Sequence, residues 1–372
     1  MSGIEIAGQS GYLDSNDTMP THTTRHGQRQ HEQMDAKSSL PKAELVHHNR
    51  SDSQSASCRS DFPMLSKSAA SLSEQAPSVK ASMGGKSIVV IGVSSQITRA
   101  LLPALSAQGH SVRGVSRHTQ SISSVPVHVL DTANLRCTPA LDHADAIISL
   151  APLPSINLAL DLCQKLNCNR LIAFGTTGVF TKANSPSPEE RVLVEQQLGG
   201  EKRLSDAGDL LGINWTLFRP TMIYGASADH NVAFIRSMIR RFHCFPMPIG
   251  ARGARQPVHL ADLASACTAA LYNTMTFNRA YNLGGGEVLL YEDMVRRIRD
   301  ADGHDAPILP IPLFVYHALV RLARRMPAFN YLREEMVDRM YADLVTDNTE
   351  ASRDFGYSPR HFEPPGLIAS SE

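Results

Sequence analysis

The sequence predicts a doubly wound α/β fold, a largely parallel sheet with helices on both faces, followed by a smaller C-terminal substrate lobe. Short β-rich runs alternate with helical patterns from Lys86 onward, which is the order of parallel βαβ units. Gly92 ends the first run and a helical pattern follows it, as in turns that bind dinucleotides. The residues before Lys86 show neither the two-residue period of a strand nor the 3.6-residue period of a helix. The folded part is therefore expected to begin near Lys86.

Strands are expected over 87–91, 111–115, 125–129, 146–150, 170–174 and 215–219, with intervening helices near 99–108, 156–166 and 189–206. Beyond Gly225 the pattern is less regular, and helices are expected at 233–242, 262–273 and 291–300. In a doubly wound sheet the ligand crevice lies at the carboxyl ends of the strands. We therefore assign 86–225 to a dinucleotide-binding domain and 226–372 to the lobe.

Residues 1–85 are rich in Ser, His, Gln and Asp and contain only Tyr12 and Phe62 as aromatics. Such a segment buries too little apolar surface to order itself, so a disordered tail is expected. Met83 lies just before the first expected strand, separated from it by three residues.

The charges exclude some classes of partner. The 36 basic and 36 acidic residues balance, with no long basic run, which argues against a nucleic-acid surface.

The six cysteines are scattered without metal-ligand spacing, which is typical of reduced thiols in a cytoplasmic protein and predicts no metal site. No apolar segment is long enough to span a bilayer.

Residues 308–327 combine an apolar face (Leu313, Phe314, Leu319 and Leu322) with three arginines. A helix here would either lie at a membrane interface, giving peripheral contact, or pack in the lobe with a solvated basic face.

The turn after the first strand keeps Gly92 but places Ser95 and Thr98 where the usual fingerprint has its later glycines. Their hydroxyls and backbone N–H groups can still face a phosphate at a helix N-terminus, although each Cβ crowds its approach. Alone, this turn is equally compatible with a plain βα connection.

Further segments follow in a fixed order: Asp131, and the ranges 147–151, 174–180, 217–225, 255–264, 281–285 and 354–359. Together with the Gly92 turn they resemble the extended short-chain dehydrogenase/reductase family, the sugar-nucleotide epimerases and dehydratases, over about 86–364. The resemblance implies a Rossmann domain that binds NAD(P). It also implies a nucleotide-linked sugar or related small molecule as the substrate, and it allows a homodimer.

The resemblance assigns Gly92, Ser95 and Thr98 to the cofactor pyrophosphate and Asp131 to its adenine. Ala151 and Pro220, in two of the other motifs, complete the expected cofactor set. Arg117 follows the second strand, where an arginine accepts the 2′-phosphate of NADP, and this tilts the expected cofactor toward NADP. An exposed arginine in a solvated loop is the alternative.

By the same resemblance, Asn231 and Arg255 occupy positions that hold the diphosphate of a nucleotide-sugar, which a guanidinium can grip bidentately. Arg255 as a surface charge is the alternative. His259 and Asp262, in the same motif, are expected to serve as hinge and capping residues.

The chemistry of the family needs a tyrosine and a lysine one helical turn apart, because the ammonium lowers the pKa of the phenol. No tyrosine lies between Tyr12 and Tyr224, and the register places Leu193 and Gln197 at the two positions. Thr176 stands at the position of the family's serine.

Lys182 and Tyr224 are candidate substitute acids, with a loop charge and lobe packing as their alternatives. Two functions stay open: an atypical enzyme acting on a nucleotide-linked sugar, and a non-catalytic binding or assembly protein of the same fold.

Overall fold

The computed structural model describes residues 85–364, except 119–121, 123–124, 133–135, 226–228, 230, 304, 327–328, 330–331 and 333–334. All of them belong to the unit Pro77–Glu372. Apart from Gly85, the tail expected over 1–85 lies outside the described residues.

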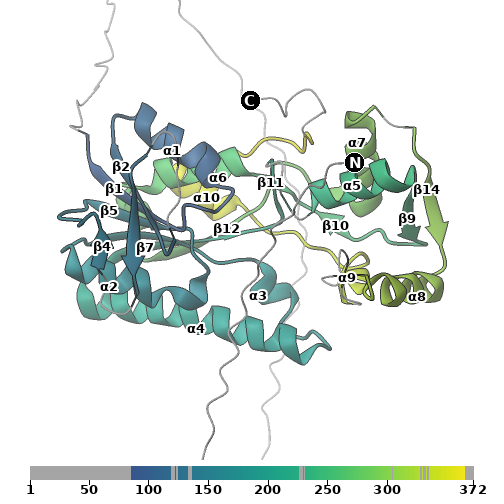
Figure 1. Cartoon of the computed structure of the whole chain (residues 1–372), viewed down its shortest axis with the longest axis horizontal. Helices are drawn as coiled ribbons and strands as arrows, with labels where there is room; N and C mark the ends of the chain where they lie inside the picture. Colours follow the sequence, from purple (N-terminus) through teal and green to yellow (C-terminus); the bar gives the residue numbers. More distant parts are fainter. Residues whose placement is uncertain are drawn as a thin grey trace, which may run out of the picture. The chain divides into compact units, whose positions relative to one another are not determined.

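Within the described part of the chain, eight strands form one sheet in the order β12-β7-β6-β5-β1-β2-β3-β4 (Figure 1). Every neighbouring pair is parallel except β3 and β4. The strands are β1 (Ser87–Ile91), β2 (Ser111–Ser116), β3 (Val127–Asp131), β4 (Arg136–Thr138), β5 (Ala146–Ser149), β6 (Arg170–Phe174), β7 (Asn214–Pro220) and β12 (Arg279–Leu283).

Helices cover both faces of this sheet (Figure 1). Residues Ile88 and Val90 of β1 contribute to one hydrophobic core, whereas Val89 and Ile91 contribute to the core on the opposite face. Such alternation is typical of a strand buried on both sides. The doubly wound fold is confirmed. The first core includes α1 (Thr98–Ala107), α6 (Leu260–Ala270) and α10 (Thr349–Phe355), and the second includes α2 (Asn157–Lys165) and α4 (Pro188–Leu211).

The chain returns to this sheet after the boundary expected at 225/226. β12 pairs with β7 at the sheet edge, and α6 and α10 pack on one face. The remaining elements after Gly225 form a lobe with its own core. We use "the lobe" for α5 (Val232–Phe242), β9 (Phe245–Pro248), α7 (Tyr291–Ala301), β14 (Ile308–Ile311) and α8 (Leu313–Ala323).

Short elements join the sheet domain to the lobe. They are α3 (Gly178–Thr181), α9 (Glu335–Asp338), the paired strands β8 (Ile223–Tyr224) and β11 (Val258–His259), and the paired strands β10 (Ala254–Arg255) and β13 (Leu289–Leu290). Two 3-10 turns, at Leu153–Ser155 and Thr274–Thr276, belong to the sheet domain.

The prediction of one helix over 308–327 was wrong. Residues Ile308–Ile311 form β14, which pairs with β9 in parallel, and α8 begins only at Leu313. Pro310 and Pro312 explain the difference, because each proline pushes the residue before it out of the helical region. Among the described residues, no helix is long and apolar enough to cross a membrane.

Candidate functional site

The turn after β1 brings Gly92 against the end of β5. Gly92 has a φ of +81°, and a Cβ there would lie 2.8 Å from the backbone nitrogen of Ala151. Only glycine fits such a turn without strain. The structure thus places Gly92 and Ala151, two of the expected cofactor residues, side by side at the carboxyl edge of the sheet.

The hydroxyls of the turn bond to its own backbone. Thr98 Oγ1 donates to the carbonyl of Val93 at 3.0 Å and also contacts the carbonyl of Ser95. Ser95 Oγ accepts the N–H of Ile97 at 3.4 Å. The side chains of Ser95 and Thr98, which stand where the usual fingerprint has glycines, therefore stabilise the turn by hydrogen bonds to its backbone. The hydroxyl of Ser95 still has its proton to donate.

Two buried glutamine oxygens are suited to a bound dinucleotide. Among the described residues, Oε1 of Gln96 and Oε1 of Gln197 are buried without a hydrogen-bond partner. Gln96 belongs to the turn after β1, and Gln197 lies on α4. A buried acceptor without a donor costs free energy, which a ribose hydroxyl or an amide of the cofactor would relieve. The residues present therefore fit NAD(P).

The other expected cofactor residues lie at strand ends. Arg117 directly follows β2 and is exposed. Asp131 is the last residue of β3, where it is exposed and lies in register with Arg136 of β4. Pro220 ends β7, and its carbonyl accepts both the N–H (3.1 Å) and the hydroxyl (3.2 Å) of Thr177.

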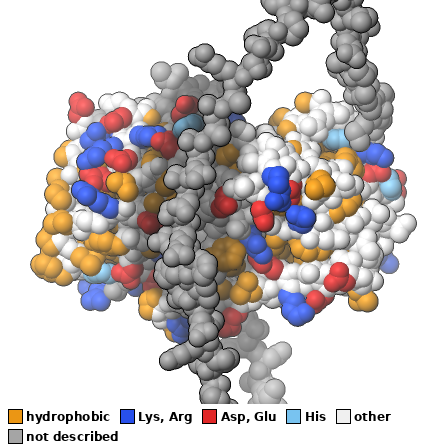
Figure 2. Space-filling view, turned by 180° about the vertical axis from the view of Figure 1, so that it is seen from behind, with side chains coloured by type: hydrophobic (Ala, Val, Ile, Leu, Met, Phe, Trp, Pro, Cys, Tyr) orange, Lys and Arg blue, Asp and Glu red, His pale blue; other side chains and the backbone are white. Residues whose placement is uncertain are grey.

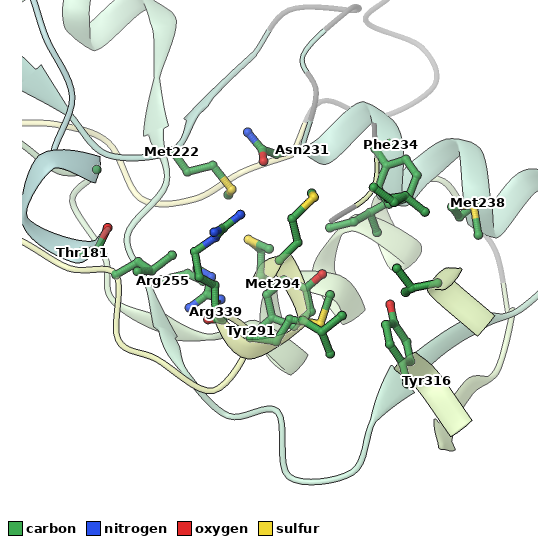
Figure 3. Close-up of a pocket in the computed structure, with 18 of the residues that line it drawn as sticks. Thr181, Met222, Asn231, Phe234, Met238, Arg255, Tyr291, Met294, Tyr316 and Arg339 are labelled. Atoms are coloured by element: carbon green, nitrogen blue, oxygen red, sulfur yellow. Dashed lines mark hydrogen bonds between the residues drawn. The ribbon is translucent and has the colours of Figure 1, made fainter. Parts of the chain in front are cut away.

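A cavity of about 420 Å³ lies between the loop after β6 and the lobe (Figure 3). Two helices each present positions i, i+3, i+4 and i+7 to it, which is one face of a helix. α5 with its N-cap supplies Asn231, Phe234, Ile235 and Met238, and α8 supplies Tyr316, Leu319, Val320 and Ala323. Tyr291 and Met294 of α7 complete the apolar wall, together with Leu332, Met336, Val337, Met340 and Leu344.

Four of the expected site residues, Thr176, Lys182, Asn231 and Arg255, line this one cavity. Thr176 Oγ1 accepts the N–H of Gly178 at 3.0 Å, which leaves its hydroxyl proton for a ligand. Asn231 is exposed at the N-cap of α5 without using its side chain as a cap. The structure thus brings together residues from the sheet domain and from the lobe.

Arg255 holds protein backbone as well as lining the cavity. Its guanidinium donates to the carbonyls of Ala254 (2.8 Å), Ala342 (2.8 Å) and Arg339 (2.6 Å) and lies 5.1 Å from the ring of Tyr291. Burial lowers the pKa of Arg255. These bonds anchor the segment after α9 and leave only the remaining N–H groups of Arg255 for a ligand.

Sequence reasoning missed a carboxylate and an arginine beside the cavity. Arg339 Nη1 donates to Glu190 Oε1 at 2.6 Å, and Lys182 Nζ lies 3.5 Å from the same oxygen. Burial alone would raise the pKa of Glu190, but the hydrogen bond from Ser185 and the charges of Arg339 and Lys182 outweigh it and lower that pKa.

Helix capping positions this carboxylate. Ser187 Oγ accepts the N–H of Glu190 at 3.4 Å at the N-cap of α4, which is one half of a capping box. The carboxylate of Glu190 accepts instead from Ser185 Oγ at 2.7 Å. This cap was the available sequence signal for Glu190. Arg339 comes from a distant segment and gave no such signal.

Tyr224 does not line the cavity. Its side chain is 0% exposed, its hydroxyl contacts the carbonyl of His361 and the N–H of Glu363 at 3.3 Å each, and its ring packs edge-on against Phe362. Burial raises the pKa of Tyr224. This environment matches the packing alternative for this residue.

The positions assigned to the tyrosine and lysine lie on α4, and neither side chain is among those that line the cavity. Leu193 is 53% exposed, Gln197 is half-buried, and both lie on the same face of the helix as Glu201. Glu201 Oε1 accepts from Arg219 Nε at 2.8 Å, which fixes the register of α4 on β7.

His259 and Asp262 make structural contacts, and the capping role expected in this motif is seen at His259. His259 Nδ1 accepts the N–H of Ala261 at 3.2 Å and caps α6, and Asp262 Oδ1 accepts from Arg360 Nε at 2.8 Å. Within the described residues, no group of three or more His, Cys, Asp or Glu side chains is placed to hold a metal ion.

Solved structures share this architecture at low sequence identity. An epimerase from Methanothermobacter thermautotrophicus matches with a TM-score of 0.59 at 15% identity, covering 77% of this chain and 90% of the epimerase. A UDP-glucose 4-epimerase from Thermotoga maritima, solved with UDP-glucose, gives 0.54 at 16% identity, covering 73% and 93%. An NAD-dependent NDP-hexosamine 5,6-dehydratase involved in tunicamycin biosynthesis gives 0.53 at 15% identity, covering 73% and 91%.

No protein-family model matches the chain, and no curated protein matches its sequence. The structural matches share the mainly parallel sheet and cover most of each relative. The chain therefore has the fold of NAD-dependent epimerases and dehydratases, the fold that its collinear motifs predict for an extended short-chain dehydrogenase/reductase.

Proposed function

We propose that this chain binds NAD(P) at the carboxyl edge of its sheet and holds a small organic substrate in the adjacent cavity. The observation that carries the proposal is that β6 ends at this edge, and the loop that begins there forms a wall of the cavity through Thr176 and Gly178. Solved structures of the same fold include an NAD-dependent dehydratase.

Different residues of the chain hold different parts of the cofactor. Gly92 and Ala151 let the backbone approach the pyrophosphate, Gln197 accepts from a ribose hydroxyl, and Arg117 pairs with the 2′-phosphate of NADP. When bound, NAD(P) supplies a hydride acceptor or donor.

The proposed substrate is an anionic small molecule, of the nucleotide-linked sugar class that the epimerase neighbour was solved with. Asn231 offers a neutral amide donor, and Arg255 offers the N–H groups that its backbone bonds leave unused. Thr176 donates its hydroxyl proton to a substrate oxygen.

Proton transfer by the usual pair is not available on α4, because the leucine at 193 carries no ionisable proton and the amide at 197 carries no positive charge. Lys182 is the substitute acid that we place at the cavity, next to Glu190. The alternative function is a non-catalytic NAD(P)-binding or assembly protein of the same fold.

The experiment that tests cofactor binding uses the full chain, purified without added ligand. We expect mass spectrometry after denaturation to recover NAD(P), and thermal shift to show stabilisation by NAD(P) that weakens in Gln197→Leu. Gln164→Leu, at an exposed position on α2, is the matched control and should respond like the wild type. No dinucleotide recovered and no stabilisation would overturn the proposal.

A membrane contact is proposed for α8. Phe314 is 76% exposed and Leu322 is 58% exposed. Arg321 lies in the last turn of the same helix, and Arg324 and Arg325 directly follow it. Figure 2 shows hydrophobic side chains gathered along the edge of the molecule that corresponds to β14 and α8. An apolar face with arginines matches an anionic lipid surface.

We expect the wild type to float with phosphatidylglycerol vesicles and Phe314→Ser with Leu322→Ser to stay in the soluble fraction. Leu210→Ser, at an 83% exposed position on α4, is the control and should float like the wild type. Equal flotation of both variants would contradict the contact.

A homodimer is proposed through α4, where Val192 and Leu198 are 49% and 46% exposed. Light scattering should give twice the chain mass in the wild type and a monomer in Val192→Lys with Leu198→Lys. A monomeric wild type would contradict it.

A further inference from the structure

The cavity beside the loop after β6 has one polar and one apolar end. Figure 3 shows Thr181, Arg255 and Arg339 on one side and Phe234, Met238 and Tyr316 on the other. Side chains on three helices of the lobe build the apolar side. A ligand that fills the cavity therefore needs two chemically different parts.

The apolar end is unsuited to a sugar ring. Five methionines line the cavity, at positions 222, 238, 294, 336 and 340, together with Phe234 and Val320. A hydroxyl placed against them would lose its water without gaining a hydrogen bond. Methionine side chains are flexible and polarizable, so they adapt to apolar ligands of varied shape.

The polar end carries surplus positive charge. Lys182, Arg255 and Arg339 line it, and Glu190 contacts Lys182 and Arg339. Asp343 does not line the cavity, and its negative charge raises the pKa of Arg255 against the effect of burial. Arginine and lysine together favour a phosphate or a carboxylate.

We propose that this cavity binds an anionic amphiphile: a hydrocarbon chain that carries a phosphate or carboxylate head. The head lies at Lys182 and Arg339, and the chain lies between α5, α7 and α8. This proposal rests on the proposed function only in that it takes the same cavity as the substrate site. The ligand that it describes has a hydrocarbon portion, which a plain nucleotide-linked hexose does not have.

The test is calorimetry on the full chain with alkyl phosphates of increasing length, each below its micelle concentration. Burial of each methylene should raise affinity about threefold to fourfold until the cavity is full. Decanoate tests a carboxylate head in place of the phosphate, and decanol tests the hydrocarbon chain without a charged head. Inorganic phosphate, which has no chain, should bind weakly. An affinity that does not depend on chain length would overturn the inference.

Matched variants on α8 locate the binding. Ala323 lines the cavity, whereas Ala318 is exposed on the same helix outside it. Ala323→Phe should abolish binding of decyl phosphate, and Ala318→Phe should bind it like the wild type. Equal binding by both variants would place the ligand elsewhere and contradict the inference.

A head-group variant keeps the test valid if Ala323→Phe folds poorly. Lys182→Gln should weaken decyl phosphate at least about tenfold, because it removes a charge-assisted contact at a partly exposed side chain, and should leave decanol unchanged. Equal losses for decyl phosphate and decanol would contradict the placement of the head.

UDP-glucose and NAD(P) distinguish this inference from the proposed function. If Ala323→Phe blocks UDP-glucose while the wild type ignores every alkyl phosphate, the inference fails and the proposed function stands. If alkyl phosphates bind and NAD(P) does not, the proposed function fails and the amphiphile site stands.

Discussion

Arg339 donates a hydrogen bond of 2.6 Å to Glu190 across 149 residues of chain. The pair joins the segment at the end of α9 to the first turn of α4, and so closes one side of the cavity. Both side chains are largely buried, with 22% and 13% of their surfaces exposed.

We expect this pair to stabilise the fold because its partners are shielded from water. Hydrogen bonds to charged groups contribute about 1.5–3 kcal/mol, so a double-mutant cycle of Glu190→Gln and Arg339→Gln by chemical denaturation should give a coupling above about 1 kcal/mol. The exposed pair Lys202–Asp206 is the control, and it should give below about 0.5 kcal/mol. Equal couplings would show that burial adds nothing here.

The second prediction concerns the preference for NADP. Arg117 follows β2 and is exposed, so its guanidinium is accessible to a 2′-phosphate. Arg117→Ala should weaken NADP at least about tenfold, which corresponds to the loss of one charge-assisted bond, and should leave NAD unchanged. Calorimetry with both cofactors measures this, and equal losses for NAD and NADP would rule the assignment out.

The central strands could be predicted from the sequence because each is an apolar run bounded by turns. β1 and β6 begin and end at the predicted residues, and β2, β5 and β7 differ by a residue at their ends. β3 begins two residues later than predicted, after Pro126.

Edge elements depend on tertiary contacts that no local pattern shows. β4 has only three residues and forms because it pairs with β3. β12 was recognised only as a motif, since the polar Asn282 interrupts its apolar pattern. The same limit applies to the site. Thr176, Asn231 and Arg255 were predicted from family-like positions and Lys182 from its place after a strand, whereas Arg339 and the methionines come together only when the lobe folds.

A third prediction concerns Arg170, which is 3% exposed. It donates to the carbonyls of Leu271 (2.7 Å), Ala270 (2.7 Å) and Asn214 (2.9 Å), and so ties the end of α6 to β6 and β7. Burial lowers the pKa of Arg170 to about 10, so the guanidinium stays charged at neutral pH.

Arg170→Met should destabilise the protein by at least about 3 kcal/mol, because each buried acceptor left without a donor costs about 1–3 kcal/mol. Arg252→Met, at an exposed position, should change the free energy of unfolding by less than about 0.5 kcal/mol. Denaturant titrations of both variants check this. A small effect at Arg170 would mean that water satisfies these carbonyls.

A fourth prediction concerns pH and the cap of α6. Burial, followed by the charge of Arg360, lowers the pKa of His259, while Asp262 opposes the shift. The unfolded chain therefore binds a proton at this histidine more readily than the folded protein does. Stability from the neutral ring is present above about pH 6.5 and is lost as the pH falls.

The cap is worth about 1 kcal/mol, so the melting temperature should fall between pH 7.5 and pH 5.5 by more in the wild type than in His259→Asn, which keeps an acceptor that does not titrate. His118→Asn, at an exposed position, should behave like the wild type. Identical pH profiles for the wild type and His259→Asn would exclude this histidine as the cause.

The last prediction separates an atypical enzyme from a non-catalytic protein. With a leucine at 193 and an amide at 197, the wild type should show little turnover by the usual mechanism. Leu193→Tyr combined with Gln197→Lys should raise turnover of a nucleotide-linked sugar by about 10²–10⁴-fold, the usual contribution of a general acid or base. The exposed position 193 can accept a phenol without overpacking the core. Leu210→Tyr, at an 83% exposed position on the same helix, should gain nothing.

Single substitutions then identify any group that acts in place of the pair. Tyr224→Phe should keep whatever activity the wild type has, since the hydroxyl contacts only backbone groups at 3.3 Å. Activity is measured by the absorbance of the reduced cofactor and by product formation. A loss of activity in Lys182→Ala and in Thr176→Ala would identify Lys182 as the substitute acid and Thr176 as the substrate donor. A wild type that is inactive with bound cofactor, and becomes active only with Leu193→Tyr and Gln197→Lys, would favour the non-catalytic function. Robust wild-type turnover that no substitution at Thr176 or Lys182 reduces would instead place the chemistry outside this cavity.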